Sequence, residues 1–425
     1  MPAEAPTIDA RRLLRRIEEL GEIGRLPEAQ GGGINRPTYG PAWLEARARV
    51  AAWMSEAGLA VRVDAAGNLI GRREGAGGAA GAAAERPVPA IALGSHIDTV
   101  PHAGALDGAY GVLAAVEVAD AVRRAGSELR HPLEVLVFAD EEGRIGGGLF
   151  GSRALAGLVE PEYAERRMDV GDAMREAGLD PRRLGEAARK PGELACYVEL
   201  HVEQGGRLDR MGGRLAVVRG IVGIRRFLVT FRGEANHAGT TEMRGRRDAA
   251  LAAAHFLLDF RERILERGEG VVGTVGALRL EPGAVNVIPG AARLEGEFRA
   301  LEAAELAELE AEVARLAEAA AERERCTAEF EPGAWDPPTL CDPRVMAALE
   351  AAARERLRGD EEVPRLDSRA GHDAQSMAHL CPVGMLFVPS LGGFSHVPQE
   401  ATRPEDLVLG AEVLLGATLR LDRTL

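Results

Sequence analysis

Short apolar runs, separated by stretches with helical spacing, dominate the first half of the chain. Residues 10–60 are predicted to be helical with a Gly/Pro interruption around 31–41, and 109–125 is predicted to be a further helix. Strands that alternate with helices predict an α/β sheet, and the unbroken apolar character of 132–139 predicts a strand buried on both faces. The predicted extended and loop segments are a hairpin at 61–71, a surface loop at 72–88, and strands at 89–94, 132–139 and 195–200.

A second, smaller series of elements begins near residue 215. Its first segment, 216–232, is predicted to be a strand pair or one long strand. Helix, strand, strand, helix and strand are predicted to follow at 246–267, 271–281, 285–299, 301–325 and 326–331. This β-α-β-β-α-β order is typical of a ferredoxin-like α+β domain. From about residue 340 the chain returns to helices and short strands. We therefore predict an α/β domain built from 1–215 and 336–425, interrupted by an inserted domain at 216–335.

Composition argues against several classes of function. The net charge of −14 and the pI of about 5.3 disfavour a nucleic-acid-binding protein, which needs a basic surface. No apolar run approaches the ~20 residues of a membrane span, and the charged N-terminus is unlike a signal peptide. The cysteines form no C-x-x-C pair and are predicted to be buried, reduced thiols, which suits a cytoplasmic protein. They are Cys196, Cys326, Cys341 and Cys381.

Two kinds of cofactor chemistry are also disfavoured. Lys190 is the only lysine, and its polar surroundings argue against Schiff-base or pyridoxal chemistry, which needs a catalytic lysine. The G-x-G-x-x-G pattern at 146–151 has the spacing of a dinucleotide-binding loop, but the acidic residues 140–142 separate it from the preceding strand. Their negative charge would repel a pyrophosphate.

Candidate chemistry is concentrated where the predicted strands end. His96 follows strand 89–94, and Asp98 is placed to orient the imidazole through its second ring nitrogen. Asp107 precedes a glycine at a predicted helix start, so it is either a metal ligand or only the N-cap of that helix.

Further polar residues follow at the next strand ends. Asp140, Glu141 and Glu142 would repel one another unless a cation or solvent neutralises them; a solvated loop is the alternative. His201 ends another strand, and His396 lies in a turn near the C-terminus. Together these donors match a two-metal hydrolase, in which one carboxylate bridges two divalent ions and a second carboxylate acts as general base.

Nine motifs occur in a fixed order along nearly the whole chain: G-S-H-I-D-T-V-P, L-D-G-A-Y-G-V, D-E-E-G, F-G-S-R-A-L-A-G, L-H-V-E-Q-G, A-N-H-A-G-T-T, A-V-N-V-I-P-G, A-G-H-D-A and S-H-V-P-Q-E. In these motifs the chain resembles the M20 metallopeptidase clan. The segments L-H-V-E-Q-G and A-N-H-A-G-T-T narrow the resemblance to the hydantoinase/carbamoylase branch. That branch comprises N-carbamoyl-L-amino acid hydrolases, allantoate amidohydrolases and β-ureidopropionases.

The resemblance implies two divalent metal ions per subunit in an aminopeptidase-like catalytic domain. Zinc or manganese is expected, and cobalt or nickel also suits ligands that are histidines and carboxylates. Glu141 would be the general base, and Asp98 would orient His96. Asp107 would bridge the two ions. The ligands of the first ion would be His96, Asp107 and His201. The ligands of the second ion would be Asp107, Glu142 and His396.

The resemblance further implies that the inserted domain is a lid and a dimerisation domain, so a homodimer is expected. His237 would stabilise the oxyanion, Arg299 would bind a substrate carboxylate, and Gln204 and Asn286 would also contact the substrate. Two departures from the branch stand out. The Arg-Phe pair usual after E-E-G is absent, and Arg369 stands where glycine is usual, which adds a cation beside the substrate.

The implied reaction is hydrolysis of the carbamoyl C–N bond of a small anionic ureide, with an N-carbamoyl-L-amino acid as the first choice of substrate. Allantoate and ureidopropionate remain open within the branch. A dipeptidase or N-acyl amino acid deacylase of the same clan is the alternative enzyme class. A third hypothesis is a binding protein that has lost its catalytic activity. The sequence disfavours it, because every metal-ligand position and the general base are present.

Overall fold

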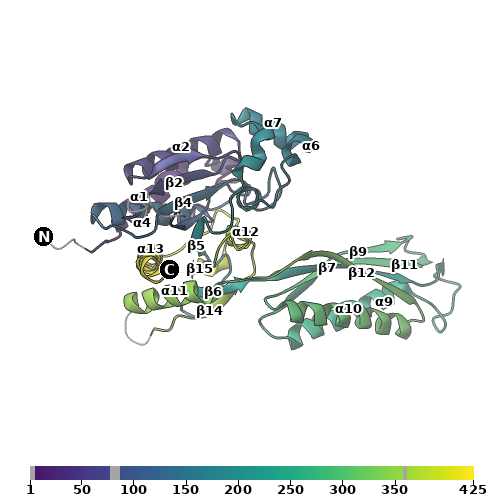
Figure 1. The fold of residues 1–425 in the computed structure, drawn as a ribbon. Coiled ribbons are helices and arrows are strands. Elements are labelled where there is room, and N and C mark those ends of the chain that lie inside the picture. Colours follow the sequence, from purple (N-terminus) through teal and green to yellow (C-terminus); the bar gives the residue numbers. More distant parts are fainter. Residues whose placement is uncertain (1–4, 77–86, 358–360) are drawn as a thin grey trace. The chain divides into compact units, whose positions relative to one another are not determined.

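The chain folds into two compact units. The computed structural model describes residues 5–76, 87–357 and 361–425 (Figure 1). The first unit comprises Met1–Arg219 with Cys341–Leu425, and the second comprises Gly220–Leu340. These divisions fall a few residues after the boundaries expected from the sequence pattern. Residues 77–86 of the predicted loop at 72–88 lie outside the described part of the chain.

The first unit is built on a mixed sheet with the strand order β1-β2-β4-β3-β5-β15-β6, and β14 also pairs with β6. β4, β3, β5 and β15 are parallel neighbours, whereas β1, β2 and β6 join by antiparallel pairing. The predicted mixed α/β class is confirmed. The strands are β1 (Ala60–Val63), β2 (Leu69–Arg73), β3 (Ala90–His96), β4 (Leu133–Phe138), β5 (Leu194–Val202), β6 (Ala216–Ile221), β14 (Arg365–Ser368) and β15 (Val383–Val388).

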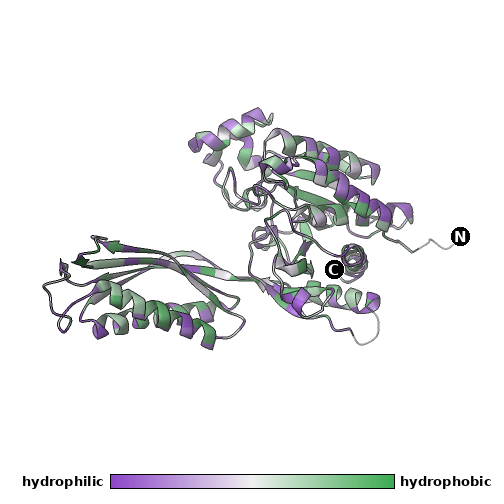
Figure 2. Cartoon of the chain, turned by 180° about the vertical axis from the view of Figure 1, so that it is seen from behind, coloured by the Kyte–Doolittle hydropathy of each residue, from purple (hydrophilic) through white to green (hydrophobic). Residues whose placement is uncertain are grey.

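The central strands of this sheet are covered on both faces. Every residue of β3, β4 and β15 is buried, and successive side chains of a strand point to opposite faces. Figure 2 shows hydrophobic residues along these strands. The burial of β4 confirms the prediction made for 132–139. A buried parallel sheet leaves the carboxyl ends of its strands as the place for polar chemistry.

Helix α4 (Ala109–Arg124) packs against β3 and is almost wholly buried. Small residues permit this closeness, since a Cβ added at Gly111 would lie 2.1 Å from the carbonyl oxygen of Leu200. The other helices of this unit are α1 (Ala10–Glu22), α2 (Pro41–Glu56), α5 (Phe150–Leu155), α6 (Tyr163–Arg166), α7 (Met168–Glu176), α8 (Arg207–Arg210), α11 (Pro343–Arg356), α12 (Asp373–Met377) and α13 (Pro404–Thr424), with 3-10 turns at Glu28–Gln30, Pro181–Ala187 and Leu391–Gly393.

The second unit has an antiparallel sheet in the order β12-β7-β11-β9, with both helices on one of its faces (Figure 1). Its main elements follow the order β-α-β-β-α-β, and phenylalanines such as Phe227 and Phe256 fill the space between sheet and helices. The elements are β7 (Gly223–Arg232), α9 (Ala249–Glu266), β9 (Val272–Glu281), β11 (Ala291–Ala300), α10 (Ala303–Arg323) and β12 (Thr327–Asp336), with the short strands β8 (Asn236–His237), β10 (Val287–Ile288) and β13 (Thr339–Leu340).

Two observations bear on the cellular setting. Among the described residues, no helix combines the length and the apolar character that crossing a membrane requires. All four cysteines are free thiols. Cys196, Cys341 and Cys381 are buried as predicted, whereas Cys326 is only partly buried. Burial raises the pKa of Cys341 and that of Cys381 to about 12, which makes these two thiols poor nucleophiles.

Candidate metal centre

The carboxyl ends of four neighbouring parallel strands meet at one edge of the first unit's sheet. His96 is the last residue of β3, the acidic run 140–142 follows β4, and His201 lies near the end of β5. The loop after β15 carries His396. Parallel pairing therefore brings together side chains that are up to 300 residues apart in the sequence.

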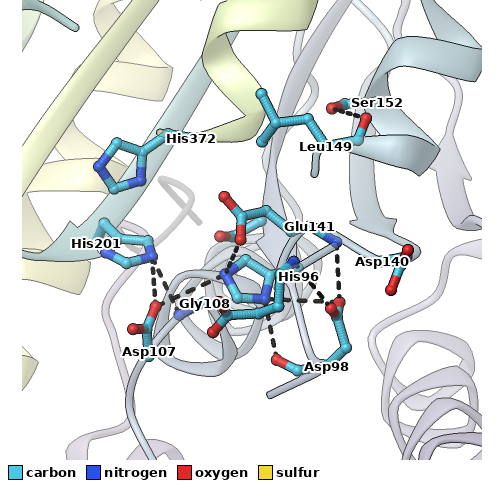
Figure 3. A network of polar contacts seen from close by, with 12 residues as sticks. His96, Asp98, Asp107, Gly108, Asp140, Glu141, Leu149, Ser152, His201 and His372 are labelled. Atoms are coloured by element: carbon cyan, nitrogen blue, oxygen red, sulfur yellow. Dashed lines mark hydrogen bonds and ion pairs between the residues drawn. The ribbon is translucent and has the colours of Figure 1, made fainter. Parts of the chain in front are cut away.

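Asp107 lies between two buried histidines from different strands. Its Oδ1 atom is 3.2 Å from Nε2 of His201 and 3.7 Å from Nε2 of His96 (Figure 3). One ligand atom from each of these three side chains lies within 4.8 Å of the other two. The Nδ1 atom of His201 is 2.8 Å from the carbonyl oxygen of Val202, a contact that leaves Nε2 directed at Asp107. This group has the size and chemistry of a divalent-ion site.

The second carboxylate oxygen of Asp107 belongs to another such group. Its Oδ2 atom is 3.1 Å from Nε2 of His396, and the same nitrogen is 3.6 Å from Oε1 of Glu142. Ligand atoms of Asp107, Glu142 and His396 again lie within 4.8 Å of one another. Gln204 donates a hydrogen bond to Oδ2 of Asp107 at 2.8 Å, and so does Ser395 at 3.0 Å. Asp107 therefore presents one oxygen to each group, which is the arrangement a bridging carboxylate needs.

Contacts with Glu400 and the close approach of Gly108 to His96 fix the loop that carries Asp107. Glu400 accepts hydrogen bonds from the backbone N–H groups of Leu106 and Asp107, at 2.7 and 3.0 Å. Gly108 adopts a φ of 63°, and a Cβ at this position would lie 2.3 Å from Nε2 of His96. Only glycine therefore allows the turn and leaves room for the imidazole.

Asp98 contacts His96 mainly through its main chain. The Nδ1 atom of His96 is 3.1 Å from the carbonyl oxygen of Asp98 and 3.7 Å from its carboxylate. The carboxylate instead accepts hydrogen bonds from the backbone N–H groups of Glu141 and Glu142, at 3.4 and 3.1 Å. Asp98 thus links His96 to the acidic run that follows β4.

Glu141 and Glu142 are aimed at the two groups by a sharp turn at Asp140. Asp140 has a φ of 57°, and its carboxylate accepts the N–H groups of Arg144 and Ile145 at 3.0 and 3.1 Å. The loop after Glu142, which departs from the branch pattern, therefore folds back and is bound by its backbone to the carboxylate of Asp140. The Oε2 atom of Glu141 lies 3.7 Å from Nε2 of His96, and Figure 3 shows its carboxylate beside that ring.

Burial and neighbouring charges shift the pKa values of these residues. Burial opposes the charged form of His96, yet the carboxylates around it raise its pKa well above the ordinary value. The hydrogen bond with Asp107 raises the pKa of His396 to about 9. Burial, reinforced by Asp107, raises the pKa of Glu142 to about 7, and burial raises the pKa of Glu141 well above its usual range. A divalent ion bound at these side chains would favour their deprotonated forms, since metal ligands bind without their protons.

The residues present fit two divalent ions. Each group supplies nitrogen and oxygen donors without a thiolate, the set that Zn²⁺ and Mn²⁺ share. The Oε1 atom of Glu142 is buried and has no hydrogen-bond partner, which a metal ion would satisfy.

The predicted substrate contacts divide between the two units. In the first unit, Gln204 lies beside Asp107, and Arg369 lines a pocket that Gln204 also lines. In the second unit, His237 is in β8, and the N–H of the next residue donates to the carbonyl oxygen of Asn286 at 3.0 Å. Arg299 is in β11, where it hydrogen-bonds to Glu297. The structure thus brings His237 close to Asn286, and Gln204 close to the metal groups.

The geometry has a counterpart in known proteins. Residues 92–420 match the family model described as Peptidase family M20/M25/M40. The chain belongs to this family. An N-carbamoyl-L-amino acid amidohydrolase of Geobacillus stearothermophilus is 41% identical to this M20 chain, over 96% of it and 97% of the relative. An allantoate amidohydrolase of Bacillus subtilis is 34% identical over 94% of each.

Solved structures agree with this family assignment. A crystal structure titled amidase of the hydantoinase/carbamoylase family, from Burkholderia multivorans, is 32% identical and covers 98% of this chain and 99% of that one, with a TM-score of 0.86. The resemblance to the M20 clan and to its hydantoinase/carbamoylase branch is therefore confirmed, and the M20 chain is a hydrolase.

Buried residues behind the M20 centre were not assigned roles from the sequence. Glu199 accepts hydrogen bonds from Ser95 and from the N–H of Ala374, at 2.8 and 2.9 Å. His372 packs edge-to-face on His201, with ring centroids 4.6 Å apart. His372 could have been found in the sequence, because it lies in the motif A-G-H-D-A. Glu199 lies inside β5, and the only sequence signal for it was that it is two residues from His201 and so points to the same face of the strand.

Proposed function

We propose that this chain hydrolyses the carbamoyl C–N bond of a small anionic ureide, an N-carbamoyl-L-amino acid, and releases the amino acid, ammonia and carbon dioxide. The observation that carries the proposal is Asp107, which offers one oxygen to each of two donor groups. The full-length relatives with amidohydrolase names support this chemistry over peptide hydrolysis.

In the proposed site, His96, Asp107 and His201 hold one divalent ion, and Asp107, Glu142 and His396 hold the other. Such ions, when bound, acidify a water molecule and polarise the ureido carbonyl group. The site does not select one metal; zinc and manganese suit it best, and cobalt and nickel are also compatible.

Glu141 acts as general base and then as general acid. It accepts a proton from the attacking water, whose oxygen forms a bond to the ureido carbon. The bond between that carbon and the amino nitrogen of the amino acid then breaks, and Glu141 returns the proton to this nitrogen. The remaining carbamate decomposes to ammonia and carbon dioxide. The buried position of Glu141 beside His96 supports this role, because burial favours its protonated form when the proton has to be carried.

The second unit is proposed to act as a lid that binds and orients the substrate. His237 donates to the developing oxyanion, and Arg299 binds the substrate carboxylate. Asn286, held beside His237, and Gln204, held beside Asp107, complete the polar contacts. A donor to the oxyanion typically contributes about 3 kcal/mol to transition-state stabilisation.

The second unit is also proposed to form a homodimer. Leu251, Leu258 and Leu265 recur at seven-residue spacing along α9 and are 43%, 64% and 58% exposed. Leucines at this spacing lie on one side of a helix and favour burial against a partner. A second copy of the chain is the proposed occupant.

A substrate panel tests the proposed reaction. Purified enzyme, loaded separately with zinc and manganese, is assayed on N-carbamoyl-L-amino acids, allantoate, ureidopropionate, dipeptides and N-acetyl amino acids. We expect the carbamoyl amino acids to have the highest kcat/KM. Higher kcat/KM for dipeptides or acetyl amino acids would refute the proposal. Higher kcat/KM for allantoate would keep the bond type and change the substrate.

A further inference from the structure

A pocket adjoining the candidate metal centre is rich in arginine. It has a volume of about 270 Å³ and lies entirely within the first unit. Gln204 lines it and donates a hydrogen bond to the proposed bridging residue Asp107. Arg207, Arg210 and Arg369 also line it. The pocket therefore extends from the site of the proposed chemistry.

The pocket has an excess of positive charge. Two carboxylates, Glu203 and Asp367, also line it. Asp367 accepts two hydrogen bonds of 2.6 Å from Arg219, so a guanidinium outside the pocket already balances its charge. Four arginines thus stand against two carboxylates.

Glu203 is bound at the start of α8, where burial raises its pKa and the nearby charges of Arg210 and Arg207 act against that rise. Its carboxylate accepts the backbone N–H groups of Arg207 and Leu208, at 3.0 and 2.7 Å. These bonds hold the carboxylate at the first turn of α8. The side chains of Arg207, Arg210 and Arg369 therefore set the electrostatic character of the pocket.

Two segments bring the arginines together. Arg207 and Arg210 lie on one turn of α8, directly after the motif that holds His201 and Gln204. Arg369 directly follows β14, next to Ser368, whose hydroxyl is 2.8 Å from Nε2 of His372. Both segments are thus fixed to the framework of the metal centre, so the distance from the pocket to the reacting bond is also fixed.

We propose that this pocket binds a carboxylate on the side chain of the substrate. The inference rests on the proposed function and names its substrate class, an N-carbamoyl-L-amino acid with an acidic side chain. Guanidinium groups bind carboxylates through paired, charge-assisted hydrogen bonds, which an amide of the same shape cannot match. Arg207, Arg210 and Arg369 then determine specificity, and the proposed role of Arg299 toward the carboxylate that all substrates of this class share is unchanged.

Two pairs of nearly isosteric substrates test the proposal. N-carbamoyl-L-glutamate is compared with N-carbamoyl-L-glutamine, and N-carbamoyl-L-aspartate with N-carbamoyl-L-asparagine, on the metal-loaded full-length enzyme. We expect at least a tenfold higher kcat/KM for the acid of one pair. Equal values, or a preference for the amides in both pairs, would overturn the inference while leaving carbamoyl hydrolysis in place. If no carbamoyl amino acid is hydrolysed, the proposed function itself fails.

Charge-removing variants identify the residues responsible. Arg369→Gln and Arg210→Gln should each lower the acid-to-amide ratio of kcat/KM at least fivefold, and the ratio cancels any general loss of activity. Arg182→Gln removes an exposed arginine outside the pocket and should leave the ratio within twofold of the wild-type value. An unchanged ratio in both pocket variants, with melting temperatures near that of the wild type, would refute the assignment.

Discussion

Glu297 accepts two hydrogen bonds from the guanidinium of Arg299, at 2.8 and 2.6 Å, on the same strand of the second unit. This pairing fixes the plane of the guanidinium that is proposed to bind the substrate carboxylate. Glu297 therefore acts through Arg299 and is a positioning residue.

The Glu297→Ala variant should raise KM about tenfold and change kcat less than twofold, because a mobile guanidinium binds a carboxylate less well in the ground state and the transition state alike. Tenfold corresponds to about 1.4 kcal/mol. Steady-state kinetics measure the effect. Glu295→Ala, on the same strand, is the matched control and should keep KM within twofold. A lower KM in Glu297→Ala would show that Glu297 competes with the substrate.

Glu141 and Glu142 are adjacent but should fail in different ways. Glu141→Gln should keep both metal ions and lose about a hundredfold or more in kcat, since the general base is removed. Glu142→Gln should lose metal, because the amide replaces a charged ligand. Elemental analysis of each purified variant, together with its kcat, makes the distinction. An active Glu141→Gln variant would contradict the assigned base.

Metal removal should lower stability as well as activity. Without a cation, the closely grouped carboxylates of Asp107, Glu141 and Glu142 repel one another or must take up protons. Dialysis against a chelator should lower the melting temperature by several degrees, and added zinc or manganese should restore it. Asp107→Asn is the control, and its melting temperature should respond little to metal. Identical melting curves with and without metal would argue against a metal centre.

A buried carboxyl that belongs to neither metal group predicts a pH effect on folding. Burial raises the pKa of Asp64 to about 6, despite hydrogen bonds from Ala66 and Asn68. The folded chain therefore holds this proton to a higher pH than the unfolded chain does. The contribution of Asp64 to stability is most favourable below about pH 4 and declines as pH rises to about 6, by about 3 kcal/mol at most.

The Asp64→Asn variant should not show this decline. The difference in melting temperature between the variant and the wild type, both in chelator, should shift in favour of the variant between pH 4.5 and 7. A difference that stays constant over this range would mean that Asp64 titrates normally in the folded chain.

The proposed dimer depends on the exposed leucines of α9. Leu258→Glu places a charge in the middle of this row, so the protein should elute with the mass of a monomer in size-exclusion chromatography with light scattering. Met168→Glu, at a position of the first unit that is 73% exposed, introduces the same charge elsewhere and should leave the dimer intact. A wild-type protein that is already monomeric would refute the dimer.

Much of the fold could be predicted because its hydrophobic pattern is strong. The continuous apolar runs that became β3 and β4 identified the buried sheet, and the amphipathic spacing of 301–325 located α10 within two residues at each end. The segment 150–187 was not predicted, because its short helices α5, α6 and α7 have few periodic positions. The single strand expected at 285–299 is divided at Pro289 and Gly290 into β10 and β11.

The site was predictable where a polar residue interrupts an apolar run, as His96 and His201 do. It was not predictable where a residue acts from a distance. Glu400 stabilises the loop of Asp107 although 293 residues separate the two, and no spacing rule connects them. The main-chain contact between Asp98 and His96 was also hidden, because a sequence does not show which oxygen of an aspartate faces a ring.

The parallel pairing of β5 with β15 has a consequence for how the protein is made. Val383 lies opposite Tyr197, so the whole second unit is synthesised between the two strands. A nascent chain can form the second unit from local contacts while the first still lacks its strand β15 and the histidine that follows it. The enzyme therefore acquires its complete set of donors only after the second unit, strand β15 and the loop with His396 have been synthesised.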